Sequence, residues 1–371
     1  MNSSKPMQSV FPKFKALVAG VVMMAFGAQS VLACTGIVIR ALDGTVVPAR
    51  TMEFGFDPQS NIIAVPVGSK IKTLALNPEE TGFTFETKYG FVGADALGKP
   101  IIVDGLNTEG LYFGAFYFIG DAIYAELTDS NRDHAVSAEE LGNWILGQFA
   151  TVKEVREALP TIQVVGTVIK EIGGEVPFHY AVADASGEAI VIEYTKDGLT
   201  IHDNTVNAIT NNPPYDWHLT NLRGYIGLQA QNYEKVKVGQ LTLTPYGQGT
   251  GMVGLPGDST SPSRFVRAVA FVNSSLPSVD SDEAVFNAFH ILNTFDIPKG
   301  SVRDGEGKDT ANDYTVWTSA ADTRNVHYYY KTYKTQAVEG IDVRAAVAAL
   351  TKPARIVMEN GFSIRDRTGD F

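Results

Sequence analysis

The sequence predicts an α+β protein in which antiparallel sheets are stacked with helices outside them. Strand and helix candidates occur in blocks, rather than in the alternating order that is typical of parallel α/β folds. The dipeptide Asp43-Gly44 lies between two strand-like segments and is a strong hairpin signal, which favours antiparallel pairing. Of the 371 residues, 44% are hydrophobic and 19% are charged, as in ordinary globular proteins, and no shift in composition marks a domain boundary. We therefore expect residues 34–371 to form a single domain.

The first predicted element is a hairpin made of residues 34–41 and 46–54. With Asp43-Gly44 as a two-residue turn, its register places Cys34 opposite Glu53. Glycine, proline and asparagine separate the strand candidates that follow, and the last of these is apolar on both faces, as expected of a strand buried between layers. These candidates are residues 61–67, 83–92, 101–103 and 111–118.

Two capping boxes mark the first helices. Ser137-x-x-Glu140 and Thr151-x-x-Glu154 each place a hydroxyl three residues before a glutamate, so we expect helices to begin there. Strand patterns then resume, with a hairpin over residues 179–193 and strands over 198–203 and 206–210.

Residues 221–258 are rich in glycine and weakly periodic, which predicts a long excursion from the fold. Ser261-Pro262 is a helix start with proline at the first helical position, and a second helix is expected over residues 281–294. The last predicted elements are strands over 314–319 and 326–333 and a short helix over 343–350.

Residues 1–33 have the pattern of a cleaved signal peptide. Lysines at positions 5, 13 and 15 precede an apolar run over residues 16–28, and small side chains stand at Val31 and Ala33. The apolar run is shorter than the roughly 20 residues that span a bilayer. We therefore expect an exported protein, periplasmic or extracellular, without stable membrane insertion after processing.

Cleavage after Ala33 would make Cys34, the only cysteine of the chain, the first residue of the mature protein. A lone cysteine has no disulfide partner in its own chain, so three explanations compete: a lipid-modified cysteine, an N-terminal nucleophile, or a buried inert thiol. Residues 31–34 resemble a lipoprotein cleavage box, although Leu32 stands where a smaller residue is usual. The junction alone does not choose between anchor and nucleophile. The strand that begins at once at Cys34 favours the nucleophile, because a lipid anchor is usually followed by a flexible tether.

Net charge and motifs exclude several functions. A formal net charge of −11 argues against nucleic acids and anionic membranes as partners. The glycines of Gly249-x-Gly251-x-x-Gly254 do not lie between a strand and a helix, so they do not indicate a dinucleotide site. The six histidines show no metal-binding spacing, and structural or surface roles are expected for each. We expect neither a cofactor nor a metal.

Four residues are candidates for a site around Cys34. Arg50 favours a thiolate by its charge, and Glu53 can hold an α-amine, although a surface ion pair explains both equally well. Residues three apart on a regular strand face opposite sides, so both can serve Cys34 only if a bulge or a strand end intervenes near positions 51–52. Asn211 ends a strand and is by itself most simply a turn former. Arg264 lies in the first turn of a helix, which the helix dipole disfavours, so it is expected to have a specific polar partner.

Together these segments resemble the choloylglycine hydrolase family, which comprises penicillin V acylases and conjugated bile salt hydrolases. The resemblance runs from Cys34 to about Tyr333 and implies the N-terminal nucleophile hydrolase fold, a four-layer αββα sandwich of two antiparallel sheets. The segments that carry it, in order, are Cys34-Thr-Gly, Ala49-Arg-Thr-Met-Glu53, residues 210–218 (TNNPPYDWH), Asn221-Leu-Arg, residues 254–258 (GLPGD) and Ser263-Arg-Phe.

The resemblance also implies roles for individual residues. Cys34 would be the nucleophile, with Arg50 stabilising its thiolate, Asn211 in the oxyanion hole and Arg264 completing the polar network. Glu53 departs from the family, which usually has aspartate there. Tyr117 stands where bile salt hydrolases typically have asparagine and some penicillin V acylases have tyrosine, so its backbone N–H would be the second oxyanion donor.

The resulting prediction is an exported amidohydrolase that cleaves linear C–N amide bonds through a thioester on Cys34, most similar to penicillin V acylase. Conjugated bile salt hydrolase and acyl-homoserine lactone acylase are the alternative activities. A lipid-anchored binding protein with Cys34 acylated, or a catalytically silent relative, are the alternatives without catalysis. An apolar, aromatic acyl pocket is expected from the loop after Phe54 and from residues 116–119 and 164–172. A homotetramer is expected, with residues 221–258 reaching a neighbouring subunit.

Overall fold

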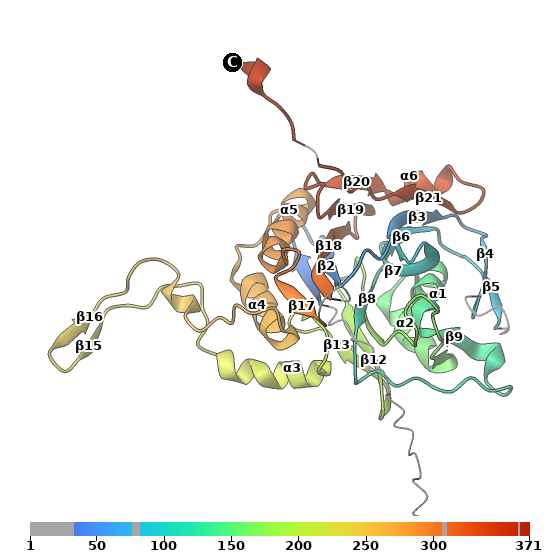
Figure 1. The fold of residues 1–371 in the computed structure, drawn as a ribbon, viewed down its shortest axis with the longest axis horizontal. Coiled ribbons are helices and arrows are strands. Elements are labelled where there is room, and N and C mark those ends of the chain that lie inside the picture. Colours follow the sequence, from blue (N-terminus) through green and yellow to red (C-terminus); the bar gives the residue numbers. More distant parts are fainter. Residues whose placement is uncertain (1–32, 76–81, 306–309, 363) are drawn as a thin grey trace, which may run out of the picture.

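The computed structural model describes residues 33–75, 82–305, 310–362 and 364–371. Its core is a pair of antiparallel sheets stacked face to face, with helices on both outer faces (Figure 1). The predicted α+β class and the four-layer αββα sandwich are thereby confirmed. Residues 1–32, which make up nearly all of the expected signal peptide, lie outside the described residues, whereas Ala33 is described and buried.

The first sheet carries the N-terminal hairpin at its centre, and its strand order is β14-β1-β2-β18-β19-β20, with β17 pairing on β18. Every pairing in it is antiparallel. The strands are β1 (Cys34–Arg40), β2 (Val46–Phe54), β14 (Ala208–Ile209), β17 (Val302–Asp304), β18 (Ala311–Asp322), β19 (His327–Thr332) and β20 (Glu339–Asp342).

The second sheet has the order β13-β12-β11-β8-β7-β6-β3-β21 and is also antiparallel. Its strands are β3 (Asn61–Val65), β6 (Phe91–Ala96), β7 (Lys99–Asn107), β8 (Tyr112–Tyr117), β11 (Phe178–Ala183), β12 (Ala189–Thr195), β13 (Gly198–Asp203) and β21 (Ala354–Val357). Short two-stranded pairs lie outside the two sheets: β4 (Lys70–Lys72) with β5 (Thr84–Glu86), β9 (Ala135–Ser137) with β10 (Gln163–Val165), and β15 (Val236–Val238) with β16 (Leu241–Leu243).

Helices α4 (Ser261–Ser274) and α5 (Ser281–Leu292) cover the first sheet, and α1 (Leu141–Gln148) covers the second. The remaining helices are α2 (Val152–Ala158), α3 (Tyr215–Asn221) and α6 (Val343–Ala348). Thr151 caps α2 by accepting a hydrogen bond from the Glu154 N–H, as its capping box predicts. The Ser137 hydroxyl instead donates to the Glu140 carboxylate, and α1 begins only after a 3-10 turn. Within the described residues, no helix is long and apolar enough to cross a membrane.

The predicted register of the first hairpin is wrong by one residue. Ala41 pairs with Thr45 through a backbone hydrogen bond of 2.9 Å, so the loop has three residues instead of two, with Gly44 at a φ of 90°. Three-residue hairpin loops commonly end on a residue in this left-handed conformation, which glycine adopts without strain. As a result, Cys34 lies opposite Met52 and not opposite Glu53.

One other prediction needs correction, and one helix was not predicted. The strand expected over residues 83–92 is divided into β5 and β6, because the N–H groups of Lys88 and Tyr89 both donate to the Gly147 carbonyl of α1 and leave the sheet. Helix α3 was not predicted, since it is short and directly follows two prolines. The excursion begins after this helix and carries the β15–β16 ribbon far from the body of the fold (Figure 1).

Candidate active site

Cys34 is the first residue of β1, and its thiol contacts the Arg50 guanidinium, which also reaches the second sheet. Only 2% of the residue is exposed. The Nη2 of Arg50 donates a hydrogen bond to Sγ over 2.9 Å, and the Met52 thioether lies 3.9 Å from Sγ. Burial raises the pKa of the thiol, whereas the positive charge of Arg50 lowers it. The fold therefore places beside the thiol a positive charge that counteracts its desolvation, and Arg264 lowers the pKa of the thiol in the same way.

The Arg50 side chain spans the space between the sheets. Its Nη1 donates to the carbonyls of Val103, at 3.2 Å, and Ala115 in the second sheet. The guanidinium lies 4.2 Å from the centre of the Phe116 ring and 5.4 Å from that of Trp317. These contacts hold the guanidinium plane in one orientation, which a flexible lysine would not achieve.

Asp104 of β7 is a carboxylate of this site that the sequence reasoning missed. It is fully buried and accepts hydrogen bonds from the hydroxyls of Tyr112 at 2.5 Å, Tyr328 at 2.6 Å and Ser319 at 2.7 Å. Burial raises its pKa, and the charge of Arg50 lowers it. The available signal was an isolated aspartate in the apolar run of residues 101–106, because a buried carboxylate needs compensation.

Asn211 follows β14 and joins three parts of the site. Its Oδ1 accepts hydrogen bonds from the backbone nitrogen of Cys34 at 2.8 Å and from Arg264 at 2.7 Å. Its Nδ2 donates to the backbone carbonyl of Tyr117 at 2.9 Å. The Cys34 nitrogen is a peptide nitrogen in this chain and occupies the place that an α-amine would take after cleavage. Since Nδ2 carries two hydrogens, one of them remains for a further acceptor.

Tyr117, the last residue of β8, presents its backbone N–H on the same edge of the strand as its carbonyl, which accepts the hydrogen bond from Asn211. The N–H of Phe118 donates to Pro177 over 2.8 Å, so the alternation of an antiparallel pair directs the N–H and C=O of Tyr117 to the opposite edge. Pairing with β7 on that edge ends at Gly114. The Tyr117 N–H and the Asn211 amide are therefore neighbours at one opening of the sheet.

Arg264, in the first turn of α4, has the polar partners that its unfavourable position predicted. Its Nη1 donates to the Cys34 carbonyl and, over 3.0 Å, to the Thr35 hydroxyl, while Nη2 donates to Asn211. Its Nε donates to the Ser259 carbonyl at 2.9 Å. All these acceptors are neutral, so Arg264 fixes the backbone around Cys34 through hydrogen bonds and not through an ion pair.

Glu53 lies on the face of β2 opposite to Arg50, as strand alternation requires. Pairing of β1 with β2 is regular through position 52, and the irregularity of this region is in β18, between Thr315 and Trp317. The Glu53 N–H donates to the Ala33 carbonyl at 3.0 Å, so Glu53 stands beside the bond that precedes Cys34. Its Oε1 accepts from the Thr315 hydroxyl at 2.9 Å, and its Oε2 has no hydrogen-bond partner among the described residues. Burial raises the pKa of Glu53 to about 7.

Five of the six predicted site residues are thus joined by hydrogen bonds, and the sixth is adjacent: Cys34, Arg50, Tyr117, Asn211 and Arg264 form the network, with Glu53 at its edge.

Comparison with known proteins identifies the protein family. Residues 34–351 match the model of the linear amide C–N hydrolases, choloylglycine hydrolase family. The chain belongs to the choloylglycine hydrolase family. It is therefore an enzyme that hydrolyses the C–N bond of linear amides.

Relatives of both activities within the choloylglycine hydrolase family are similar to this chain. A bile salt hydrolase/transferase of Clostridium perfringens is 34% identical, covering 84% of this chain and 92% of the relative. A penicillin V acylase of Pectobacterium atrosepticum is 25% identical, covering 87% and 84%. A crystal structure of a conjugated bile acid hydrolase variant from Clostridium perfringens, at 30% identity, superposes with a TM-score of 0.80 over 90% of this chain and 100% of that one.

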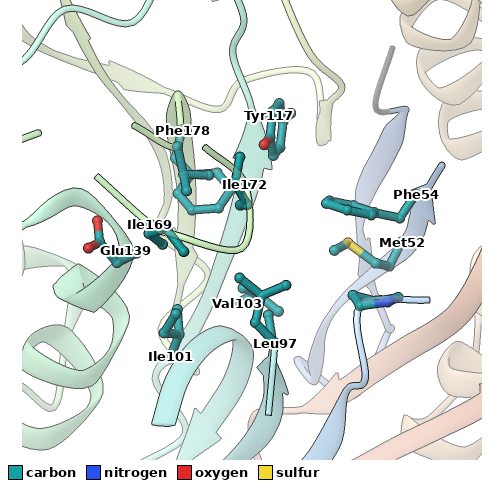
Figure 2. A pocket seen from close by; sticks show the side chains of 13 residues that line it. Met52, Phe54, Leu97, Ile101, Val103, Tyr117, Glu139, Ile169, Ile172 and Phe178 are labelled. Atoms are coloured by element: carbon teal, nitrogen blue, oxygen red, sulfur yellow. The ribbon is translucent and has the colours of Figure 1, made fainter. Parts of the chain in front are cut away.

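The pocket of this choloylglycine hydrolase family member opens beside Met52, two residues from Arg50, and its lining is almost entirely apolar (Figure 2). About 390 Å³ of it is free of atoms, part of this being open to solvent. All three segments predicted to form it contribute. The lining residues are Met52, Phe54, Pro58, Ala96, Leu97, Ile101, Val103, Tyr117, Glu139, Ile169, Ile172, Val176 and Phe178. Those not predicted are Met52, Glu139 and the residues on β6, β7, β11 and the turns beside these strands.

Three aromatic rings form the wall next to the site. The rings of Tyr117 and Phe54 meet edge to face at 6.1 Å, and those of Tyr117 and Phe178 at 5.5 Å. Such an arrangement suits a flat apolar group lying against ring edges and faces. In the part of the chain that the structure describes, no three histidine, cysteine or acidic side chains are grouped so as to hold a metal ion.

Proposed function

We propose that Cys34 is the nucleophile of this hydrolase and acts once an export peptidase has cut the chain after Ala33. The observation that carries the proposal is the placing of both functional atoms of Cys34. Sγ lies 2.9 Å from the Arg50 guanidinium, and the backbone nitrogen lies 2.8 Å from the Asn211 side chain. A strand that holds both atoms this firmly serves no purpose for a lipid anchor.

In the proposed reaction, the α-amine of Cys34 accepts the thiol proton, since an α-amino group has a reference pKa of about 8. The thiolate attacks the amide carbonyl, and the free hydrogen of Asn211 Nδ2 and the N–H of Tyr117 stabilise the oxyanion. The α-ammonium then gives its proton to the leaving amine, and a thioester to Cys34 remains. Water, deprotonated by the α-amine, hydrolyses the thioester and releases the acid.

Glu53 contributes at the α-amino group of Cys34. The α-ammonium that forms during the reaction is a positive charge near the Glu53 carboxyl, and this charge favours the carboxylate form. Arg264 lowers the pKa of Glu53 in the same direction. The Glu53 carboxylate would then keep the α-ammonium in place between its two proton transfers.

The preferred substrates are amides with a flat aromatic acyl group, of which the phenoxyacetyl group of penicillin V is the example. The aromatic wall of Tyr117, Phe54 and Phe178 supports this choice. Tyr117 also supports this choice, because some penicillin V acylases have tyrosine at the corresponding position.

Conjugated bile salts are the second candidate substrates. The 34% identity to a bile salt hydrolase/transferase, above the 25% identity to a penicillin V acylase, favours them. Their steroid acyl group is also apolar, and part of the pocket beside Met52 is open to solvent.

A substrate panel tests the proposal. Processed wild-type protein and its Cys34→Ser variant are compared on penicillin V, glycine- and taurine-conjugated bile salts and acyl-homoserine lactones. We expect turnover that depends on Cys34, with the highest kcat/KM on penicillin V. A higher kcat/KM on a bile salt would replace the first candidate by the second. Absence of Cys34-dependent turnover on every substrate would count against the nucleophile.

We also propose a homotetramer in which the β15–β16 ribbon contacts a neighbouring subunit. The ribbon pairs Val236 with Leu243 and Val238 with Leu241, so these four apolar side chains share one face. All four are about half exposed or more in the single chain. An apolar face on a projecting ribbon is expected to be covered by another protein surface.

A further inference from the structure

Three buried side chains lie beneath the turn at Thr210–Asn211 and have no part in the chemistry above: His179 of β11, Glu193 of β12 and His218 of α3. Each is 1% exposed. The Nε2 of His179 lies 3.0 Å from the Thr210 carbonyl, and the Nε2 of His218 lies 2.9 Å from the Asn211 carbonyl. Two histidines thus hold two successive carbonyls of the turn that carries the oxyanion residue.

Both ring nitrogens of His179 have hydrogen-bond partners. Its Nε2 faces a carbonyl, which only accepts, and its Nδ1 faces Glu193 Oε1 at 3.1 Å. Glu193 also accepts from His202 Nε2 at 3.3 Å and from the Tyr215 N–H at 2.9 Å. Burial raises the pKa of Glu193, yet the bonds from His179 and His202 outweigh it and bring that pKa to about 2. Glu193 therefore orients the ring of His179, whose other nitrogen contacts the Thr210 carbonyl.

His218 is held differently. Its Nε2 must donate to the Asn211 carbonyl, while its buried Nδ1 has no hydrogen-bond partner among the described residues. Burial lowers the pKa of His218 to about 4, so the ring is neutral. The ring stacks on Phe265 with centres 4.5 Å apart and planes at 14°, and Phe265 is adjacent in sequence to Arg264.

His179 also contacts the strand of the second oxyanion donor. Its ring stacks on Phe118 at 4.3 Å with planes at 3°, and it meets the Phe116 ring edge to face at 6.2 Å. These two residues flank Tyr117 on both sides. One imidazole therefore touches the neighbours of both predicted oxyanion donors, the turn of Asn211 and the end of β8.

We propose that His179, oriented by Glu193, and His218 are positioning residues that fix the distance between the Asn211 amide and the Tyr117 N–H. This inference rests on the proposed function, because the two donors matter only if an oxyanion forms between them. The histidines touch no substrate and act through the two carbonyls that they hold.

The kinetic test compares His218→Phe, which keeps the ring packing on Phe265 but loses the donor, with His218→Gln, which retains an N–H at nearly the same reach. We expect His218→Phe to lower kcat by about 10-fold or more with KM nearly unchanged, because oxyanion contacts strengthen in the transition state. His218→Gln should recover most of that loss. Equal losses in the two variants, or a loss confined to KM, would overturn the inference. Thermal unfolding of both variants checks that they fold.

The second test addresses Glu193 and His179. Glu193→Gln loses the carboxylate that orients the His179 ring, so we expect it to lower kcat with KM nearly unchanged, and thermal unfolding checks that the variant folds. A wild-type kcat in folded Glu193→Gln would contradict the role given to the His179–Glu193 pair.

The activity of the wild type distinguishes a failure of the proposed function from a failure of the positioning role. If wild type shows no Cys34-dependent turnover, the proposed function fails and the positioning role falls with it. If wild type is active and His218→Phe is equally active, only the positioning role fails.

Discussion

The side-chain amide of Asn211 bridges Cys34 and Tyr117, with Oδ1 2.8 Å from the backbone nitrogen of Cys34 and Nδ2 2.9 Å from the backbone carbonyl of Tyr117. Cys34 belongs to the first sheet of the sandwich and Tyr117 to the second. One amide therefore sets both the position of the nitrogen that we propose as the base and the position of the opening where the oxyanion is expected.

Replacing Asn211 should separate these two tasks. Asn211→Asp keeps an oxygen for Cys34 and Arg264 but removes the N–H donor, so we expect kcat to fall about 100- to 1,000-fold with a smaller change in KM. Asn211→Ala should lose at least as much, because the Cys34 nitrogen also loses its acceptor. Steady-state kinetics on the best substrate of the panel measure both. Full activity in Asn211→Asp would exclude its amide from the oxyanion hole.

The contributions of Arg50 and Asp104 to the free energy of unfolding are expected to depend on each other. Arg50→Met leaves the buried Asp104 carboxylate without its positive neighbour, which should lower the free energy of unfolding by about 3–5 kcal/mol. The double variant Arg50→Met/Asp104→Asn should recover part of this loss, because the uncompensated charge is gone. Urea denaturation of the two single variants and the double variant gives the coupling. Strictly additive effects would mean that the two charges do not interact.

The same Arg50→Met variant should react more slowly at its thiol. Arg50 lowers the pKa of the Cys34 thiol, so its removal leaves burial to raise that pKa further. The rate of alkylation by iodoacetamide, followed against pH, should show an apparent thiol pKa higher than that of wild type. An unchanged profile would show that the guanidinium does not stabilise the thiolate.

Glu139, in the pocket wall, should make stability depend on pH. Burial raises its pKa from 4.5 to about 7, so the folded state binds this proton more tightly than the unfolded chain does. Its stabilising contribution is therefore present at low pH and is lost as pH rises from about 4.5 through 7, by up to roughly 3 kcal/mol. Glu139→Gln should remove this part of the decline in the free energy of unfolding, whereas the exposed Glu157→Gln should not. Parallel profiles for wild type and Glu139→Gln would refute the prediction.

Activity should require a free amine on Cys34. A variant that blocks processing, such as Ala33→Pro, should retain the leader and show no turnover, because a peptide nitrogen is not a base. Mass spectrometry of the active wild-type protein should give a chain that begins with an unmodified Cys34. A diacylglyceryl group on that residue would instead support the lipid-anchored binding protein.

The β15–β16 ribbon should control the oligomeric state. Leu241→Glu places a charge on the apolar face of the ribbon and should shift the tetramer to smaller species in light scattering coupled to size exclusion. Thr242→Glu, one residue further along and on the other face, is the matched control and should leave the tetramer intact. If neither substitution changes the mass, the ribbon is not the contact between subunits.

Most of the fold was predictable because its signals are local. Alternating patterns gave the hairpin of residues 34–54 and the strands up to Tyr333, and the capping box at Thr151 gave the start of α2. The register of the first hairpin was not predictable in the same way. Asp43-Gly44 is compatible with a two-residue or a three-residue loop, and the backbone contact between Ala41 and Thr45 decides between them.

The sequence by itself determined the class of fold, the order of most of its elements and six residues of the candidate site, since these depend on periodicity, turn chemistry and motifs within short segments. Only the tertiary structure decided that Glu53 stands beside Ala33, that Asp104 accompanies Arg50, and that buried histidines hold the turn of Asn211. These relationships join residues far apart in the chain. A buried charge or donor must find its partner across the interface of the two sheets, and the stacking of the sheets alone fixes which partner that is.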